Sequence, residues 1–345
     1  MGIHGGALAQ GLIAAGQGRR LAGGPLAFTH VQVLERGRPP AWLPLAGLEA
    51  GFARWPEWRE AAMAGLERLT APRAPWAGLT FERTRIMGIV NVTPDSFSDG
   101  GAFLDPERAV AHGRALRAAG ADIIDVGGES TRPGADPVAP EEEIRRVLPV
   151  VKALASGGAL VSIDTRHAAV MEAALAAGAR VINDVSALAG DPRSLAVAAR
   201  SSAAVVLMHM GGQPKTMQDD PQYEDVTLDV YDFLAARIAA CAEAGIQPQR
   251  ILVDPGLGFG KTAAHNFTLL ARLAVFHGLG TGILVGASRK SFLAKAGGDR
   301  PSDRLGASLA AALTAAAQGV QVLRVHDVAT TREALALKDQ IDSAI

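Results

Sequence analysis

Residues 160–185 read LVSIDTRHAAVMEAALAAGARVINDV, and this stretch decides the fold. A short apolar run ends in Asp164, and an alanine-rich helical segment follows it. Gly178 stands where that helix should stop, because glycine favours the left-handed conformation that closes a helix. A second apolar run then ends in Asn183 and Asp184. A strand, a helix and another strand in so short a stretch are typical of the βαβ unit of a parallel sheet.

The same alternation continues from about residue 80 to the end of the chain. The predicted strands are 85–92, 122–126, 160–164, 181–185, 204–209, 251–253, 282–285 and 322–326. Helices expected between and after them include 105–119, 140–154, 167–177, 227–244, 302–317 and 331–345. Eight strand–helix units in about 250 residues are the size and order of a TIM (β/α)8 barrel. A doubly wound α/β sheet is the alternative, although it would not need eight such regular units.

Residues 1–79 differ from the rest in being rich in Gly, Ala and Pro. A possible strand pair, 26–34 and 42–45, precedes a stretch with helical spacing of apolar residues at 55–69. No cluster of polar residues suggests chemistry there. We therefore expect a small N-terminal extension of unknown role, 1–79, followed by a barrel domain, 80–345.

Composition excludes several classes of protein. The 34 basic and 35 acidic residues give a net charge of −1, so nothing favours general binding of nucleic acid. A hydrophobic fraction of 48% excludes a disordered chain. The single cysteine, Cys241, excludes an intrachain disulfide framework and indicates a reducing compartment. Neither a long apolar run nor a signal peptide is evident, so we expect a cytoplasmic enzyme with no membrane association.

Polar residues follow nearly every predicted strand. TIM barrels carry their chemistry at the carboxyl ends of the strands, and there this sequence places Asn91, Asp125, Asp164, Asn183, Asp184, His209, Asp254, Lys290, Arg324 and His326. Any one Asp at such a position is as readily a helix cap as a ligand-binding group. A whole rim of polar strand ends instead indicates an enzyme or a protein that binds a small molecule.

The signs of these groups narrow the ligand. Lys290 follows the seventh strand, and Arg324 and His326 end the eighth, a region where barrels frequently bind phosphate. Asp164, Asn183 and Asp254 would instead suit a flat heterocycle with several N–H donors. The run 255–262 nearly matches a P-loop, but a proline stands where the first glycine belongs. Its glycines therefore predict a tight turn at which backbone approaches a ligand.

These residues lie in segments that resemble dihydropteroate synthases. The segments are MGIVNVTPDSFSDGG at 87–101, DVGGESTRPG at 125–134, SIDT at 162–165, INDVS at 182–186, LMHM at 207–210, 254–261, SRKS at 288–291 and RVHDV at 324–328. The resemblance covers roughly residues 81–345 in the family's order and leaves 1–79 outside the common core.

The resemblance implies a cytoplasmic transferase of folate biosynthesis in a family targeted by sulfonamides. It would condense 6-hydroxymethyl-7,8-dihydropterin diphosphate with p-aminobenzoate, using Mg²⁺, and would form a homodimer. The implied pterin-binding residues are Asp164, Asn183, Asp254, Lys290 and Arg324. The implied diphosphate-binding residues are Asn91, Arg324 and His326, with Asn91 also the metal ligand. The implied p-aminobenzoate-binding residues are Phe97, Thr131, Arg132, Pro133 and Ser291. The implied catalytic residues are Asn91, Asp99, Lys290, Arg324 and His326.

Two alternatives remain open at this point. A methyltetrahydrofolate-dependent methyltransferase would share the pterin readers but would not need a diphosphate site. A non-catalytic pterin-binding paralogue should have lost a group at the diphosphate or metal positions, and none is missing here. The sequence therefore favours the synthase.

Overall fold

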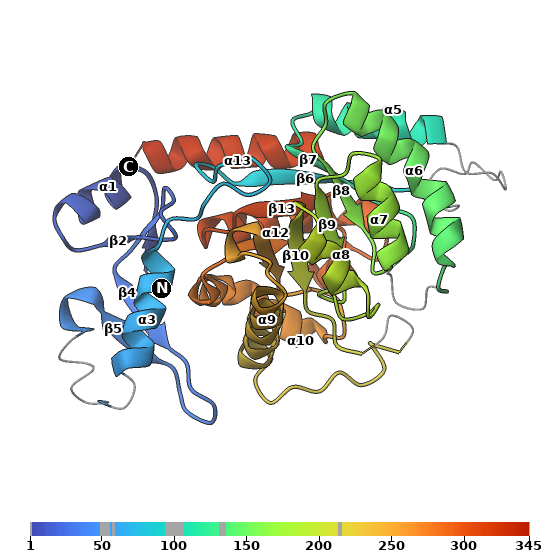
Figure 1. Cartoon of the computed structure of the whole chain (residues 1–345). Coiled ribbons are helices and arrows are strands. Elements are labelled where there is room, and N and C mark those ends of the chain that lie inside the picture. Colours follow the sequence, from blue (N-terminus) through green and yellow to red (C-terminus); the bar gives the residue numbers. More distant parts are fainter. Residues whose placement is uncertain are drawn as a thin grey trace.

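The computed structural model describes residues 2–48, 56, 59–93, 106–130, 136–212 and 216–344. Eight parallel strands form a closed barrel in these ranges, and helices surround it (Figure 1). The strands are β6 (Arg85–Asn91), β7 (Ile123–Gly127), β8 (Val161–Asp164), β9 (Val181–Asp184), β10 (Ala204–Met208), β11 (Ile251–Asp254), β12 (Gly282–Val285) and β13 (Val322–Val325). β13 pairs with β6 and closes the barrel. The predicted TIM barrel is confirmed.

The outer layer consists of the helices that follow the strands. They are α5 (Pro106–Ala118), α6 (Pro140–Ser156), α7 (Ala168–Ala176), α8 (Ser194–Arg200), α9 (Val226–Glu243), α10 (Ala263–Ala271), the short α11 (Ala294–Gly297), α12 (Leu305–Ala317) and α13 (Val328–Ser343). Two predicted helix starts were wrong by three residues. Residues Pro301–Arg304 form a 3₁₀ turn, so α12 begins later than 302, and α13 begins earlier than 331. Within the described ranges, no helix has both the length and the apolar character needed to cross a bilayer.

The N-terminal extension, blue in Figure 1, lies beside the barrel. Its elements are β1 (Ile3–His4), α1 (Gly6–Ala14), β2 (Arg19–Arg20), β3 (Ala27–Phe28), β4 (His30–Val33), β5 (Ala41–Pro44) and α3 (Arg59–Thr70). The predicted strand 26–34 was wrong as one strand, because β3 joins a three-stranded sheet with β1 and β2 whereas β4 pairs with β5. The helix predicted at 55–69 runs from Arg59 to Thr70, and residues 55, 57 and 58 lie outside the described ranges.

The barrel and the extension have separate apolar cores. The extension packs Leu21, Leu26, Phe28, Leu43, Leu48 and Leu66 together. Trp76 lies within the predicted extension but packs inside the barrel, where it contacts the interior cluster that includes Met87, Val206 and Leu284. It is 1% exposed, and its Nε1 donates to the carbonyl of Arg250 at 2.9 Å. Trp76 therefore fills the end of the barrel opposite the carboxyl ends of the strands.

Candidate active site

Side-chain alternation along the strands explains how the site forms. Successive side chains of a strand point to opposite faces, so every second residue of a barrel strand points inward. Met87, Val181, Leu252 and Val322 belong to the apolar interior cluster near the amino ends of their strands. The residues that follow on the same faces are Asn91, Asn183, Asp254 and Arg324. The sheet thus builds an apolar floor and a polar mouth from the same strands.

Arg324 crosses the mouth of the barrel. It belongs to β13, yet its Nε donates to Oδ2 of Asp125 on β7 and its Nη2 donates to Oδ2 of Asp164 on β8, both at 2.6 Å. Such short, charge-assisted hydrogen bonds hold the guanidinium in a fixed plane. Burial raises the pKa of Asp164, and the Arg324 charge opposes that effect. The predicted pterin residues Asp164 and Arg324 are therefore direct partners in this structure.

Asp125 is the site residue that sequence reasoning did not assign to a role. It is fully buried and joins two of the predicted residues, because its Oδ2 accepts from both Arg324 and Nδ2 of Asn183, the latter at 3.1 Å. Its Oδ1 is buried without a hydrogen-bond partner. The available signal was an aspartate on the inward face of a buried strand, two residues after Ile123.

Asp254 and Lys290 form a second pair of opposite charges. Burial raises the pKa of Asp254, and the positive charge of Lys290 opposes the rise. Burial lowers the pKa of Lys290 to about 8, with Asp254 opposing. The Lys290 ammonium donates to the carbonyl of Leu257 and lies 4.4 Å from the ring centroid of Phe259. The two groups therefore influence each other's charge across the loop that follows β11.

That loop requires glycine at two positions. Gly256 has a φ of +68°, and a Cβ there would lie 1.9 Å from the carbonyl oxygen of His209. Gly258 has a φ of +85°, and a Cβ there would meet Cδ of Lys290 at 3.0 Å. The backbone amide of Gly256 donates to Oδ1 of Asp254 at 2.7 Å. The glycine-rich turn thus brings backbone against Asp254 and Lys290.

Lys261 stabilises the same loop through hydrogen bonds of its side chain. Its buried ammonium lies 2.9 Å from Nδ1 of His209 and donates to the carbonyls of Gly256 and Phe259, each at 2.9 Å. Burial lowers the pKa of His209 to about 3, with the Lys261 charge acting in the same direction. These two polar residues of the rim are therefore internal supports of the loop.

The remaining predicted residues occupy different places on the rim. Asn91 is partly buried at the end of β6, opposite Gly127 of β7. His326 follows β13, and its Nδ1 lies 3.1 Å from the hydroxyl of Ser288. Ser291 is exposed at the start of a 3₁₀ turn. The predicted residues Phe97, Asp99, Thr131, Arg132 and Pro133 lie outside the described residues.

Asp184 illustrates a polar strand end with a structural role. Its side chain points away from the Asn183 face of β9 and accepts from the amide of Ser186 at 2.7 Å and from the amide of Leu188 at 3.0 Å. Ala187 and Leu188 have positive φ values of 53° and 60°, so these bonds hold an unusual turn. Asp184 therefore stabilises the loop after β9.

Comparisons with known proteins show which family the chain belongs to. The family model described as pterin binding enzyme matches residues 87–326, which is more than half of the chain. The dihydropteroate synthase of Escherichia coli (strain K12) is 47% identical over 272 residues, covering 79% of this chain and 96% of that protein. That of Neisseria meningitidis serogroup C is 47% identical over 271 residues, covering 76% and 96%.

Solved structures give the same result. Xanthomonas albilineans dihydropteroate synthase with 4-aminobenzoic acid aligns with a TM-score of 0.74 and 49% identity, covering 79% of this chain and 98% of that one. The complex of the Xanthomonas albilineans enzyme with 7,8-dihydropteroate aligns with a TM-score of 0.71 and 46% identity, covering 79% and 99%. With a barrel mouth built as described, this chain belongs to the pterin-binding enzyme family, among the dihydropteroate synthases.

Proposed function

We propose that the barrel mouth binds 6-hydroxymethyl-7,8-dihydropterin diphosphate and transfers its pterin to the amine of p-aminobenzoate. A C–N bond forms, the C–O bond to the diphosphate breaks, and 7,8-dihydropteroate and diphosphate are released. The observation that carries this proposal is the meeting of acidic, basic and amide side chains on the inward faces of six strands. Asn91, Asp125, Asp164, Asn183, Asp254 and Arg324 occupy those faces.

The acidic side would read the pterin ring. A dihydropterin offers several N–H donors in one plane, and Asp164, Asn183 and Asp254 offer oxygen acceptors from three strands. The buried Oδ1 of Asp125 has no hydrogen-bond partner, so it supplies a further acceptor at this depth. The carboxylate of Asp254 also stabilises positive charge that develops in the ring as the C–O bond breaks.

The basic side would hold the diphosphate. Arg324 would flank the pterin ring and, with Asn91 and His326, bind phosphate oxygens. Lys290 would bind the pterin. Without a ligand, Arg324 donates to Asp125 and Asp164. The substrate would therefore take over part of this hydrogen bonding, which makes Arg324 common to both halves of the substrate.

Magnesium is the proposed cofactor, and the donors present fit it. Asn91 offers an amide oxygen at the strand end where the diphosphate would lie. Mg²⁺ usually keeps waters and takes one or two protein oxygens together with substrate phosphates, so a single protein ligand suffices. When bound, the ion neutralises charge on the leaving diphosphate.

The p-aminobenzoate side remains a proposal from the sequence. Phe97, Thr131, Arg132 and Pro133 would enclose the ring, Ser291 would bind the carboxylate, and Asp99 would belong to the same first loop. An arylamine is neutral at pH 7, so its attack needs no strong general base. We further propose that the enzyme acts in the cytoplasm and forms a homodimer. Light scattering on the purified chain measures its mass and so tests the homodimer directly.

An assay of dihydropteroate formation tests the proposed function. The full chain, with both substrates and Mg²⁺, should release 7,8-dihydropteroate and diphosphate, and chelation of the metal should abolish turnover. A folded chain that forms no product with both substrates and Mg²⁺ would show the proposal to be wrong. Methyl transfer from methyltetrahydrofolate instead would favour the methyltransferase alternative.

A further inference from the structure

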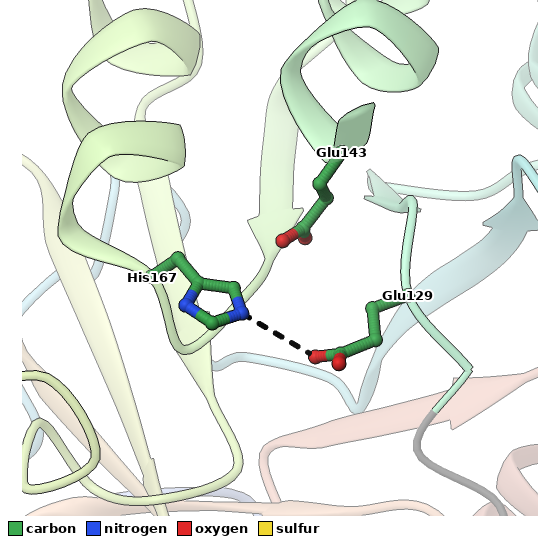
Figure 2. Close-up of side chains that lie close together, drawn as sticks. All are labelled: Glu129, Glu143 and His167. Carbon is green, nitrogen blue, oxygen red and sulfur yellow. Dashed lines mark ion pairs between the residues drawn. The ribbon is translucent and has the colours of Figure 1, made fainter. Parts of the chain in front are cut away.

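Three side chains outside the barrel mouth converge beside the second strand–helix loop. Glu129 follows β7, Glu143 lies in the first turn of α6, and His167 immediately precedes α7 (Figure 2). One ligand atom from each lies within 4.8 Å of the others. Figure 2 shows the Glu143 carboxylate and the His167 ring directed toward a shared space above the Glu129 carboxylate.

The charges of this cluster do not balance. Arg166 donates to both carboxylate oxygens of Glu129, at 3.0 and 2.9 Å, and so offsets that charge. Glu143 is 0% exposed, and neither of its oxygens has a hydrogen-bond partner. A buried, unpaired carboxylate is costly, so it takes up either a proton or a cation. Burial raises the pKa of Glu143 to about 8, and the negative charges of Glu129 and Asp164 act in the same direction.

His167 offers an open nitrogen to the same space. Its Nε2 is buried without a hydrogen-bond partner and lies 3.9 Å from Oε2 of Glu129. A proton on Glu143 would satisfy that carboxylate, but the structure places no hydrogen bond between Glu143 and His167. A single cation that accepts an electron pair from the Glu143 carboxylate and from Nε2 of His167 is therefore a better match than a proton on either.

We propose that Glu129, Glu143 and His167 bind a divalent transition-metal ion, represented by Zn²⁺, through one oxygen of each carboxylate and Nε2 of the imidazole. Zn²⁺ binds both imidazole nitrogen and carboxylate oxygen, and three such protein ligands completed by water give tetrahedral coordination. Zinc–ligand distances of about 2.0–2.2 Å require small inward movements of the side chains. Imidazole disfavours Mg²⁺, so this site is distinct in chemistry and position from the proposed magnesium site at Asn91.

The ion would join three elements of the outer layer. It would link the loop after β7 to α6 and to the start of α7, next to Asp164 at the end of β8. Because the ligands are separate in the unfolded chain, binding would add to the stability of the folded state. Its role is therefore structural, and its test does not depend on the transferase reaction.

Calorimetric titration of the full, chelator-treated chain with Zn²⁺ tests the site, with millimolar Mg²⁺ present as competitor. We expect one zinc ion per chain and a rise in Tm on binding. Glu143→Gln and His167→Gln should each weaken the binding at least tenfold and remove the rise in Tm. Glu141→Gln is the matched control, because Glu141 lies exposed on the same helix and should leave both unchanged.

Two results would overturn the proposal. One is the absence of saturable binding of one zinc ion by the folded wild-type chain. The other is binding that Glu143→Gln and His167→Gln leave unchanged. In either case the three side chains hold no metal ion, and the site proposed here does not exist.

Discussion

Asp125 is a single residue whose substitution tests the site, because it forms a salt bridge with Arg324. Asp125→Asn keeps the shape but removes the charge that binds Arg324 and weakens the acceptor for Asn183. A buried charged hydrogen bond is worth about 1.5–3 kcal/mol, so kcat/KM for the pterin diphosphate should fall roughly 10–100-fold. Steady-state kinetics of the folded variant measure this loss.

Asp122→Asn is the matched control for that prediction. Asp122 also pairs with arginines, accepting from Arg83 and Arg85, but it precedes β7 at the opposite end of the barrel. It should lower stability slightly and leave kcat/KM unchanged. Equal kinetic losses in both variants would show that Asp125 acts on the fold and not on the substrate.

The lowered pKa of Lys290 predicts how the activity depends on pH. A lysine loses its charge as the pH rises through its pKa, and burial places that pKa at about 8, with Asp254 opposing. If the charge binds substrate, kcat/KM should be constant below about pH 7 and fall as the pH rises above about 8. Lys290→Arg remains charged throughout, so its lower activity should lack this decline. A decline at the same pH in the variant would assign it to another group.

Trp76 tests how the packing between structural elements contributes to stability. It fills the amino end of the barrel, so Trp76→Ala leaves a cavity among the residues that begin β6, β10 and β12. Such truncations cost about 3–5 kcal/mol, which denaturant unfolding measures. Trp42→Ala should change stability by no more than about 0.5 kcal/mol, because Trp42 is 54% exposed. The Trp76 variant should keep its KM values if the floor and the mouth are independent.

The barrel elements could be predicted because two kinds of local signal marked them. A continuous apolar run marked each strand, and a glycine marked the end of many helices. Gly120, Gly178, Gly245 and Gly319 all have positive φ values, as expected for helix ends. Boundaries were less certain because apolar patterns do not show where hydrogen bonding stops. His209 was assigned to a strand, yet β10 ends at Met208 and His209 turns toward Lys261.

The candidate site could be predicted less completely than the barrel. Strand ends identified the residues on the rim, but sequence alone could not separate Asp184, which stabilises a turn, from Asn183, which points inward. Asp125 was recognised as a polar strand end but given no role, and only its pairing with Arg324 reveals one. Partners from distant strands are set by barrel closure, which no local pattern encodes.

At the scale of the whole molecule, the extension was the part least open to prediction. Its strands β1, β2 and β3 have two residues each, too few to show alternation. Helix α1 is composed almost entirely of small and apolar residues, so it lacks a polar face. The short strands are stabilised by packing in the extension's own core. Helix α1 is stabilised by packing beside α13, near the C-terminus (Figure 1).

The extension meets the barrel through helix packing and polar contacts, and an open cavity lies between the two. Arg36 pairs with Asp229 and Asp232 of α9, and Arg68 donates to the carbonyl of Gly278. A cavity of about 550 Å³ lies between the two, with Val31 and Leu66 on one side and Tyr231 and Val275 on the other. Such an interface does not require the extension for the barrel to fold. Because Trp76 packs inside the barrel, we propose that the barrel domain begins before this residue.

Two truncations test that boundary. A chain beginning at Ala71 keeps Trp76 and also Arg73, whose guanidinium donates to the carbonyls of His277 and Thr281. It should retain the kcat/KM of the full chain. A chain beginning at Leu79 loses both residues and should be less stable by about 3–5 kcal/mol, because the amino end of the barrel is left empty. Denaturant unfolding and steady-state kinetics compare the two. Loss of turnover in a well-folded chain beginning at Ala71 would mean that the extension contributes to the active site, whereas equal stability of both chains would place the boundary at residue 79.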